Sequence, residues 1–390
     1  MNILHVISSC EPKKGGPIEG IKQFNNYYKN FGINAHILCS DKKKAKWLKD
    51  KRLPKVFATG PKKFDYAYNP KMLTWLDKNI NRYDLIIVNG IWQYHNYAVW
   101  KVAKKFNKPY YVFTHGMLDP WFKKNYFFKH IKKVNYWNFI QYRILKDARS
   151  VLYTSNEEKR LAKKSFYPFN IKEKVIGYGI KGNLYKINKK YNSFIKKFPE
   201  TKNKRIILFF GRVHEKKGLD ILIKCFIKIF SKNTNFHLVI AGPYNDKNFK
   251  ELNRLIQNPE IKQSITWTGP LYNKLKWDAY ASSEIFCLPS HQENFGISVV
   301  EAMSCKKPVI ITNKINIWKT IKKNSAGFVA NDNVVSFYSS FKKYLKLNEK
   351  EYKKYCKNSY NCFIKNFHIK PITRNLAIYL KMTFKLNQFK

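Results

Sequence analysis

The chain has 390 residues, which is long enough for two domains that each bury a core. Its 75 basic and 25 acidic residues give a formal net charge of +50, while 44% of the residues are hydrophobic. This apolar content excludes a chain too polar to fold. The charge is compatible with nucleic-acid binding, with attraction to anionic lipid, or with a compositional lysine bias, and all three interpretations stay open.

No apolar run approaches the 18 residues needed to cross a membrane, and the chain opens on a strand-like NILHVIS rather than on a signal peptide. The seven cysteines are scattered without a C-x-x-C pair, which indicates buried thiols in a reducing compartment. We therefore expect a cytoplasmic protein. The cysteines are Cys10, Cys39, Cys225, Cys287, Cys305, Cys356 and Cys362.

In the first half, apolar strands alternate with amphipathic helices. We predict strands at Ile3–Ser8, Ala35–Cys39, Leu85–Asn89, Tyr110–Thr114, Ser150–Thr154 and Lys174–Tyr178, and helices at Ile18–Phe31, Asn96–Phe106 and Phe122–Lys146. The second half repeats the pattern. There we predict strands at Ile206–Phe210, His237–Ala241, Thr266–Thr268, Ile285–Leu288, Val309–Ile311 and Gly327–Val329, with a helical tail from 350 to 390.

Near-continuous apolar strands alternating with helices indicate parallel sheets covered on both faces. The predicted fold is α/β, with two Rossmann-like domains facing one another across a cleft and ligands at the carboxyl ends of the strands. We place the boundary after the GYGI turn, and the polar stretch 181–204 is predicted to form the linker and the entry to the second domain. The expected domains are 1–180, 181–365, and a C-terminal helix, 366–390.

Gly15 and Gly16 follow the first strand and precede a helix that begins near Pro17. Glycine permits positive φ and close approach of a ligand to the backbone amides, although a simple tight turn explains the pair equally well. His115 ends another strand and is followed by Gly116. Its position at a carboxyl end beside a glycine favours a side chain that faces a ligand over a structural histidine.

Arg212 and Lys217 follow an apolar strand and flank a turn that opens a helix at Gly218. A guanidinium offers paired hydrogen bonds and an ammonium offers a compact charge, which together suit a diphosphate. For either residue alone, a solvated surface charge is the commoner explanation. The two residues together are a more specific signal, because an arginine, a turn and a Lys-Gly pair follow one another between a strand and a helix.

The segment SHQENFGISVVEAMSCKKPVIIT, from Ser290 to Thr312, places Glu293 and Glu301 eight positions apart. On one helix, at 1.5 Å per residue, they would be about 12 Å apart, which is about the length of a sugar joined through a diphosphate to ribose. Amides of Phe295, Gly296 and Ile297 at the helix start would face the phosphates. The alternative is two surface glutamates on an ordinary helix.

Residues 121–146 contain no acidic residue and mix lysines with aromatic side chains. A basic, aromatic helix of this kind lies on anionic lipid, or it is an amphipathic helix whose aromatic residues face the core. Both interpretations are kept. The mixed residues are Lys123, Lys124, Lys129, Lys132 and Lys133 with Phe122, Tyr126, Phe127, Phe128, Tyr136 and Trp137.

Together these segments resemble glycosyltransferase family 4, the retaining nucleotide-sugar transferases of GT-B fold. ILHVISSCEPKKGGPIEGIKQF resembles the family's first strand, glycine loop and helix. THGMLDPWF (114–122) resembles its active-site histidine segment, and VLYTSNEEKRLA (151–162) resembles the strand and helix that close the N-terminal domain. The resemblance spans about residues 1–365 and departs at NKINIWKTI (313–321), where many members carry a glycine pair and an acid. An Asn-Ile-Trp version belongs to a subgroup associated with bacterial surface polysaccharides.

The resemblance implies a donor site and an acceptor domain. Gly16 would meet the β-phosphate, His115 and Glu293 the sugar, and Arg212 and Lys217 the leaving diphosphate. Asn294, Phe295 and Gly296 would supply backbone amides, and Glu301 would bind the ribose hydroxyls. The N-terminal domain would hold a glycan or polyprenyl-diphosphate-linked acceptor. The last helix of the chain would cross back and pack on this domain.

No Asp-x-Asp motif and no His/Cys cluster of metal-ligand spacing occurs, so we expect a metal-independent enzyme without a cofactor. The expected enzyme is a hexosyltransferase of cell-surface polysaccharide synthesis, cytoplasmic and peripheral at the inner face of the membrane. Two alternatives remain: a basic protein that binds nucleic acid or membrane, and a GT-B epimerase or phosphorylase. Specific nucleic-acid binding is disfavoured because no RNA- or DNA-binding motif occurs.

Overall fold

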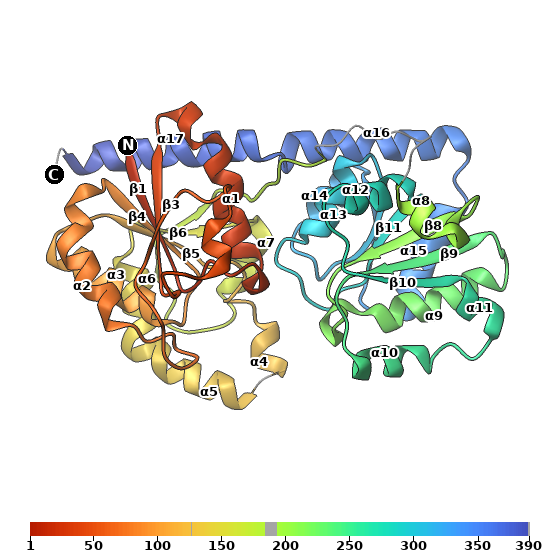
Figure 1. Ribbon diagram of the computed structural model, residues 1–390, viewed down its shortest axis with the longest axis horizontal. Coiled ribbons are helices and arrows are strands. Elements are labelled where there is room, and N and C mark those ends of the chain that lie inside the picture. The colour runs from red at the N-terminus through yellow and green to blue at the C-terminus, as the bar shows by residue number, and fades with distance from the viewer. Residues whose placement is uncertain (126, 184–192, 389–390) are drawn as a thin grey trace. The chain divides into compact units, whose positions relative to one another are not determined.

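The structure is a computed structural model that describes residues 1–125, 127–183 and 193–388. Contacts divide it into two compact units, Met1–Gly179 with Ile369–Lys390 (unit 1) and Ile180–His368 (unit 2) (Figure 1). Parts of the predicted linker (184–192), of the helix at 122–146 (residue 126) and of the tail (389–390) fall outside the described residues.

Unit 1 is built on a parallel sheet in the order β3-β2-β1-β4-β5-β6-β7. Its strands are β1 (Asn2–Ile7), β2 (Asn34–Cys39), β3 (Lys55–Ala58), β4 (Leu85–Asn89), β5 (Tyr110–Phe113), β6 (Ser150–Tyr153) and β7 (Glu173–Val175). Its α-helices are α1 (Gly16–Tyr28), α2 (Pro70–Asn79), α3 (Tyr94–Lys105), α4 (Trp121–Asn125), α5 (Phe127–Tyr136), α6 (Tyr142–Asp147), α7 (Asn156–Ala162) and α17 (Ile369–Gln388).

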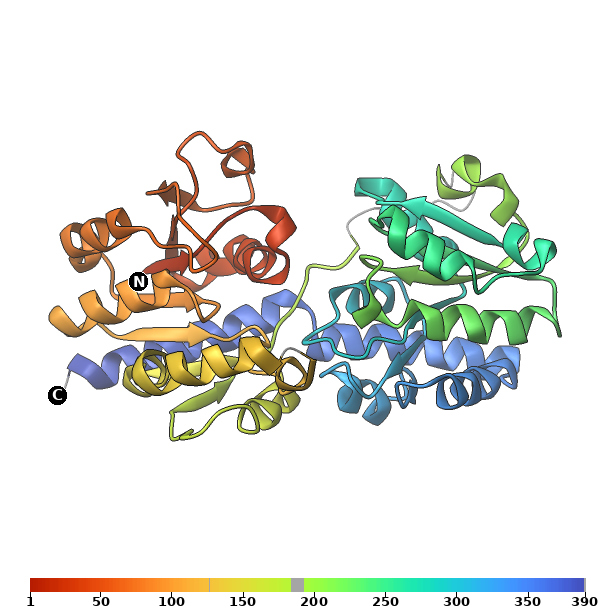
Figure 2. The same cartoon turned by 90° about the horizontal axis from the view of Figure 1, so that it is seen from below.

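Both faces of this sheet are buried. Leu4, Ile86 and Val112 pack on one face against α2, α3 and α6, while the alternate residues Ile3 and Ile87 pack on the other against α1 and α17 (Figures 1 and 2). The alternation follows from the two-residue period of a strand. C-terminal helix α17 is therefore part of the core of unit 1.

Unit 2 has a second parallel sheet, in the order β10-β9-β8-β11-β12-β13. Its strands are β8 (Arg205–Phe210), β9 (Phe236–Ala241), β10 (Ile265–Gly269), β11 (Ile285–Leu288), β12 (Val309–Thr312) and β13 (Gly327–Ala330). Its α-helices are α8 (Ser193–Lys197), α9 (Leu219–Phe230), α10 (Asp246–Asn253), α11 (Pro259–Gln263), α12 (Asn273–Ser282), α13 (Ile297–Ser304), α14 (Trp318–Lys323), α15 (Val334–Leu345) and α16 (Glu349–Asn366). Helices α9 and α12 lie on opposite sides of the sheet (Figure 1).

The predicted α/β class with two Rossmann-like domains is confirmed, and β4 and β11 have the predicted bounds. Strand β3 was missed, because KVFA is a short run at the sheet edge. The described residues of the helix predicted for 122–146 are all helical, with a π-helical turn at Trp137–Gln141 between α5 and α6. The predicted entry to the second domain folds into unit 2, where Phe194 of α8 is fully buried and the Ser193 hydroxyl donates to Asp278 (2.5 Å).

Three fully buried histidines make stability depend on pH. Burial lowers the pKa of His5 to about 3 and those of His95 and His237 to about 4. Each ring has a neutral partner: the Tyr28 hydroxyl for His5, the Asn89 carbonyl for His95, and the Thr266 hydroxyl for His237.

We predict that the free energy of unfolding falls as the pH is lowered from 6.5 to about 4. Because the folded-state pKa values lie below the unfolded value of about 6.5, the unfolded chain binds more protons across this range. Each histidine contributes a slope of up to about 1.4 kcal/mol per pH unit. Urea unfolding at several pH values measures the slope, which should be shallower in His237→Gln. An equal slope in both proteins would contradict the assignment.

Candidate functional site

The strand order of each sheet reverses at one point, and loops beside each reversal carry predicted site residues of that unit. In unit 1 the reversal lies between β1 and β4, and in unit 2 between β8 and β11. Open parallel sheets bind ligands at the carboxyl ends of the strands beside such a point. The loops after β1 and β8 carry Gly15 and Arg212, and the loop after β11 carries Glu293.

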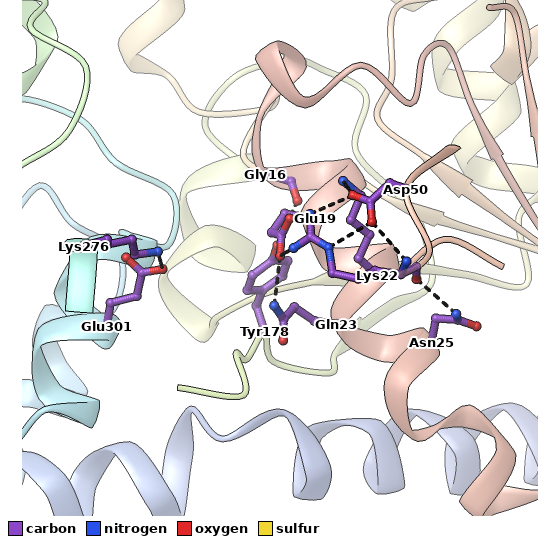
Figure 3. Close-up of polar contacts among 10 residues, drawn as sticks. Gly16, Glu19, Lys22, Gln23, Asn25, Asp50, Tyr178, Lys276 and Glu301 are labelled. Carbon is purple, nitrogen blue, oxygen red and sulfur yellow. Dashed lines mark hydrogen bonds and ion pairs between the residues drawn. The ribbon is translucent and has the colours of Figure 1, made fainter. Parts of the chain in front are cut away.

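The glycine loop after β1 leads directly into α1. Gly15 has φ 85° and precedes the helix, which begins at Gly16, slightly earlier than predicted. A Cβ at either glycine would meet nothing within 4 Å, so the backbone there is openly accessible. The Gly16 carbonyl accepts a hydrogen bond from the buried Tyr178 hydroxyl (2.8 Å; Figure 3). This hydrogen bond links the start of α1 to the C-terminal end of the segment Met1–Gly179.

His115 occupies an unusual backbone position after β5. Its φ is 49°, in the region that favours glycine, and its ring stacks on Phe113 with centroids 5.4 Å apart. Burial lowers the pKa of His115 to about 3, so the ring is neutral at neutral pH. Its Nε2 donates to Asn89 Oδ1 (3.4 Å), which leaves Nδ1 as an acceptor.

The partner of His115 belongs to a buried polar chain that the sequence analysis missed. Asn89, the last residue of β4, donates from Nδ2 to His5 Nδ1 (3.2 Å), and His5 Nε2 donates to the Tyr28 hydroxyl (3.0 Å). These contacts fix both the amide orientation of Asn89 and the tautomer of His115. An asparagine closing the apolar run LIIVN was the sequence signal for this role.

A buried carboxylate, Glu158 at the start of α7, holds the His115 loop. One oxygen accepts from the Thr114 hydroxyl (2.7 Å) and the Gly116 amide (2.5 Å). The other accepts from the amide (2.7 Å) and hydroxyl (2.6 Å) of Thr154. Glu158 thus accepts four hydrogen bonds. Those from Thr114 and Gly116 hold the residues on either side of His115 and so stabilise its positive φ. Glu158 lies within a segment noted above but was not singled out there.

In unit 2, the loop after β8 and the loop after β11 are in close contact at Gly218. This residue has φ 62°, and a Cβ there would lie 2.1 Å from the Pro289 carbonyl oxygen. The His291 amide donates to the Lys216 carbonyl (2.9 Å) and joins the same two loops. Only glycine permits this approach, so the Lys-Gly pair has a structural cause as well as a charge.

The approach brings Lys217 into direct contact with Glu293. The Lys217 ammonium donates to Glu293 Oε2, and both side chains are about one-fifth exposed. Burial by itself would raise the pKa of Glu293, but the charges of Lys217, Lys216 and Arg212 outweigh it and lower the pKa. Arg212 is exposed beside this pair. Three of the predicted residues are therefore brought together within unit 2.

Residues of the segment 313–321 support the Glu293 loop. The Glu293 amide donates to the Lys314 carbonyl (3.0 Å), and the Asn316 amide donates to the Glu293 carbonyl (3.0 Å). The Asn316 side chain also donates to Asn294 Oδ1 (3.2 Å). Lys314 and Asn316 thus fix the backbone of Glu293, and Asn316 also holds the side chain of Asn294.

Helix α13 begins at Ile297, so Glu293 precedes it and the helical rise used above does not apply between Glu293 and Gly296. Gly296 has φ 75° and no side chain of the described residues caps the helix. The first N–H groups of a helix lack intrahelical partners and favour anions. Phe295 turns inward and packs edge-on against Phe367, with centroids 5.7 Å apart.

Glu301 lies in the second turn of α13 and is held by two residues that the sequence analysis missed. Lys276 Nζ lies 2.5 Å from Oε1 (Figure 3), and the Tyr280 hydroxyl donates to Oε2 (3.0 Å). Both partners belong to α12. The Lys276 ammonium also lies over the Trp277 ring, 4.7 Å from its centroid. Glu301 is therefore an oriented, buried carboxylate rather than a surface residue.

One group of metal-ligand type occurs among the described residues, although no cluster was expected. Cys10, Cys39 and Asp41 are buried with their ligand atoms within 4.8 Å. Both Asp41 oxygens already accept hydrogen bonds, from the Ser9 hydroxyl and the Cys10 amide (both 2.6 Å). A hydrogen bond with Cys10 and burial raise the pKa of the Cys39 thiol, which disfavours the thiolate that a metal needs. The metal-free expectation stays a prediction.

The fold is GT-B, as comparison with solved structures shows. Anabaena HepE in complex with UDP and glucose superposes with a TM-score of 0.76 at 18% identity, covering 98% of this chain and all of that one. A glycosyltransferase from Rickettsia africae superposes with a TM-score of 0.77 at 21% identity, covering 98% of each chain.

The match to a family model falls within unit 2. Residues 191–361 match the family model described as glycosyl transferases group 1. Human alpha-1,3/1,6-mannosyltransferase ALG2 is 24% identical over 37% of each chain. The capsular polysaccharide biosynthesis glycosyltransferase CapM of Staphylococcus aureus is 27% identical over 40% of this chain and 41% of its own. The matches span about two fifths of these relatives.

We predict that Glu158→Gln lowers the free energy of unfolding by about 2–6 kcal/mol. An amide nitrogen cannot accept hydrogen bonds, so two buried donors lose their partners at about 1–3 kcal/mol each. The adjacent Glu157→Gln is the matched control, because Glu157 pairs with the half-exposed Arg160 and its loss costs less than about 1 kcal/mol. Urea unfolding measures both, and equal losses would contradict the role of Glu158.

We also predict that Gly218→Ala costs about 1–3 kcal/mol more stability than Gly269→Ala. Both glycines have similar φ, 62° and 66°, so an alanine would strain the backbone equally at the two positions. Only at Gly218 does a Cβ meet another atom, whereas at Gly269 it meets nothing within 4 Å. Thermal unfolding of the two variants tests this, and equal midpoints would show that the two loops are not in close contact.

Proposed function

We propose that the protein is a glycosyltransferase that moves a sugar from a nucleotide-diphosphate sugar to an acceptor. The observation that carries the proposal is the Lys217–Glu293 contact beside Arg212 at the strand reversal of unit 2. This cluster lies within the part that matches the glycosyl transferases group 1 model. The GT-B structures solved with UDP and with UDP-glucose support a nucleotide-sugar donor.

The roles of the unit 2 residues follow from their chemistry. Arg212 and Lys217 offset the charge that the diphosphate gains as it leaves, where transition-state stabilisation has most effect. Glu293 accepts hydrogen bonds from the sugar hydroxyls, and Glu301 accepts both hydrogen bonds of the ribose diol. Asn294, Phe295 and Gly296 supply backbone amides to sugar and phosphate. Lys276 and Tyr280 orient the Glu301 carboxylate.

Unit 1 is proposed to complete the donor contacts and to hold the acceptor. The accessible backbone at Gly15 and Gly16 suits the β-phosphate, and the neutral ring of His115 suits a sugar hydroxyl. Because the His115 ring is neutral, it forms no ion pair with the departing phosphate. Arg212 and Lys217 neutralise the charge of that phosphate instead. The reaction retains the anomeric configuration, with the leaving phosphate deprotonating the acceptor on the same sugar face. It needs no metal and no protein base.

The acceptor is proposed to be a glycan or a polyprenyl-diphosphate-linked glycan of a cell-surface polysaccharide. The capsular-polysaccharide relative supports this class. No helix of the described residues is long and apolar enough to cross a membrane. Residues 121–146 are proposed to contact anionic lipid at the membrane surface, since Phe128 and Phe139 are 81% and 71% exposed among lysines. Trp137 of the same segment is fully buried, so only part of its aromatic surface faces outward.

Thermal unfolding with UDP-, GDP-, ADP- and dTDP-sugars in the presence of EDTA tests the donor. A ligand at 100 times its dissociation constant stabilises the fold by about 2.7 kcal/mol. We expect one nucleotide family to raise the midpoint of the wild type and to leave Glu301→Gln unchanged.

The control is Glu284→Gln, which breaks a different carboxylate pair of unit 2, with Arg205. This variant should unfold earlier but keep the ligand-induced shift. No shift of the wild type with any sugar nucleotide would contradict the proposed activity.

A further inference from the structure

A small basic pocket lies in unit 1 beside the loop that carries His115. Its volume is about 200 Å³, and Met117, two residues beyond His115, forms part of its wall. Side chains of α5 close it on one side, and Ser165 and Phe166 after α7 contribute on another. Pockets for drug-sized ligands have volumes of about 300–1,000 Å³, so this volume suits a small group rather than a whole sugar nucleotide.

The charge of this pocket is unbalanced. Lys123, Lys129 and Lys133 line it together with His130, and Asp119 is the one carboxylate of its described lining. Asp119 Oδ1 accepts the Trp121 amide (2.9 Å) at the start of α4. Burial lowers the pKa of His130, and the charges of Lys123 and Lys133 lower it further. Three ammonium groups therefore face one carboxylate in a confined space.

Lys133 is the most constrained of these cations. Its ammonium lies over the Trp92 ring (4.9 Å to the centroid) and the Phe122 ring (5.6 Å). Burial lowers its pKa and the charge of Lys129 lowers it further. Within the described part of the chain, no carboxylate forms an ion pair with it. Aromatic rings stabilise a desolvated cation only in part, so an anion would offset the remaining cost.

We propose that this pocket binds a phosphate or diphosphate group of the acceptor. A group with two or more negative charges balances the lysines, and ammonium groups bind phosphate as point charges. The apolar side chains of Met117, Phe122 and Phe166 leave room beside the lysines for an attached chain. The assignment to the acceptor rests on the proposed transferase activity, whereas the phosphate chemistry rests on the pocket alone.

The test compares two lysines of the same helix. Lys133→Met removes the pocket cation and keeps a long apolar side chain between the two rings. Lys132→Met makes the same charge change at an exposed position outside the pocket. Calorimetric titration with inorganic pyrophosphate and with farnesyl diphosphate measures binding outside the donor site when the nucleoside diphosphate of the stabilising sugar nucleotide is present in excess. Flotation with phosphatidylglycerol vesicles measures attraction to lipid headgroups.

We expect both diphosphates to bind the wild type and the Lys132 variant alike. Lys133→Met should weaken both at least about tenfold, as expected for loss of one charged hydrogen bond. Tighter binding of farnesyl diphosphate than of pyrophosphate would assign the pocket to a lipid-linked group, and equal binding would assign it to a soluble phosphate ester. Either result supports the site.

No binding of either diphosphate, or equal weakening in the two variants, would overturn the proposal. Vesicle binding that depends on Lys133 without any diphosphate binding would overturn it in favour of a headgroup contact. Separate titrations with UDP, GDP, ADP and dTDP alone keep the two proposals apart. If one of these nucleotides binds and the two diphosphate probes do not, only the pocket assignment fails. If none of the four nucleotides binds, the transferase proposal fails whatever the pocket does.

Discussion

Parallel strand pairing, with both sheet faces buried, is the constraint on which the rest of the structure depends. In unit 1, alternate residues of β1 and β4 pack against different sets of helices, so the strand interiors are almost entirely apolar. Polar chemistry is then confined to the ends of the strands, and the reversal of strand order opens space there. Asn89, Arg212 and Glu293 each lie at or just beyond a strand end.

Carboxylates with several partners give these strand ends their shape. Glu158 fixes the backbone on both sides of His115, and α12 supplies the partners that orient Glu301. Glu293 is held twice, by Lys217 through its side chain and by residues 314–316 through its backbone. Such contacts preorganise a site, because the groups that would meet a ligand do not have to be ordered when it binds. The close approach at Gly218 makes the Lys217–Glu293 contact possible.

Much of the fold could be predicted from the sequence, because buried parallel strands are continuous apolar runs with their own signature. Strand β3 lacked that signature, since it is short and only partly buried at the sheet edge. The π-helical turn before α6 involves no proline or glycine and so left no local signal. Candidate residues next to a strand end or glycine were found, whereas Glu158, Lys276 and Tyr280 were missed. Their importance comes from partners distant in sequence, and local patterns do not contain that information.

The measurement that most directly tests the central claim is a calorimetric comparison of Glu293→Gln with the wild type. Each protein is titrated with the sugar nucleotide that stabilises the wild type and with the corresponding nucleoside diphosphate. If Glu293 binds the transferred sugar and Lys217 the diphosphate, the variant should lose about tenfold in affinity for the sugar nucleotide. It should bind the nucleoside diphosphate at least as tightly as the wild type, because Lys217 no longer shares its charge with a carboxylate. Equal losses for both ligands, or no loss for either, would contradict the account.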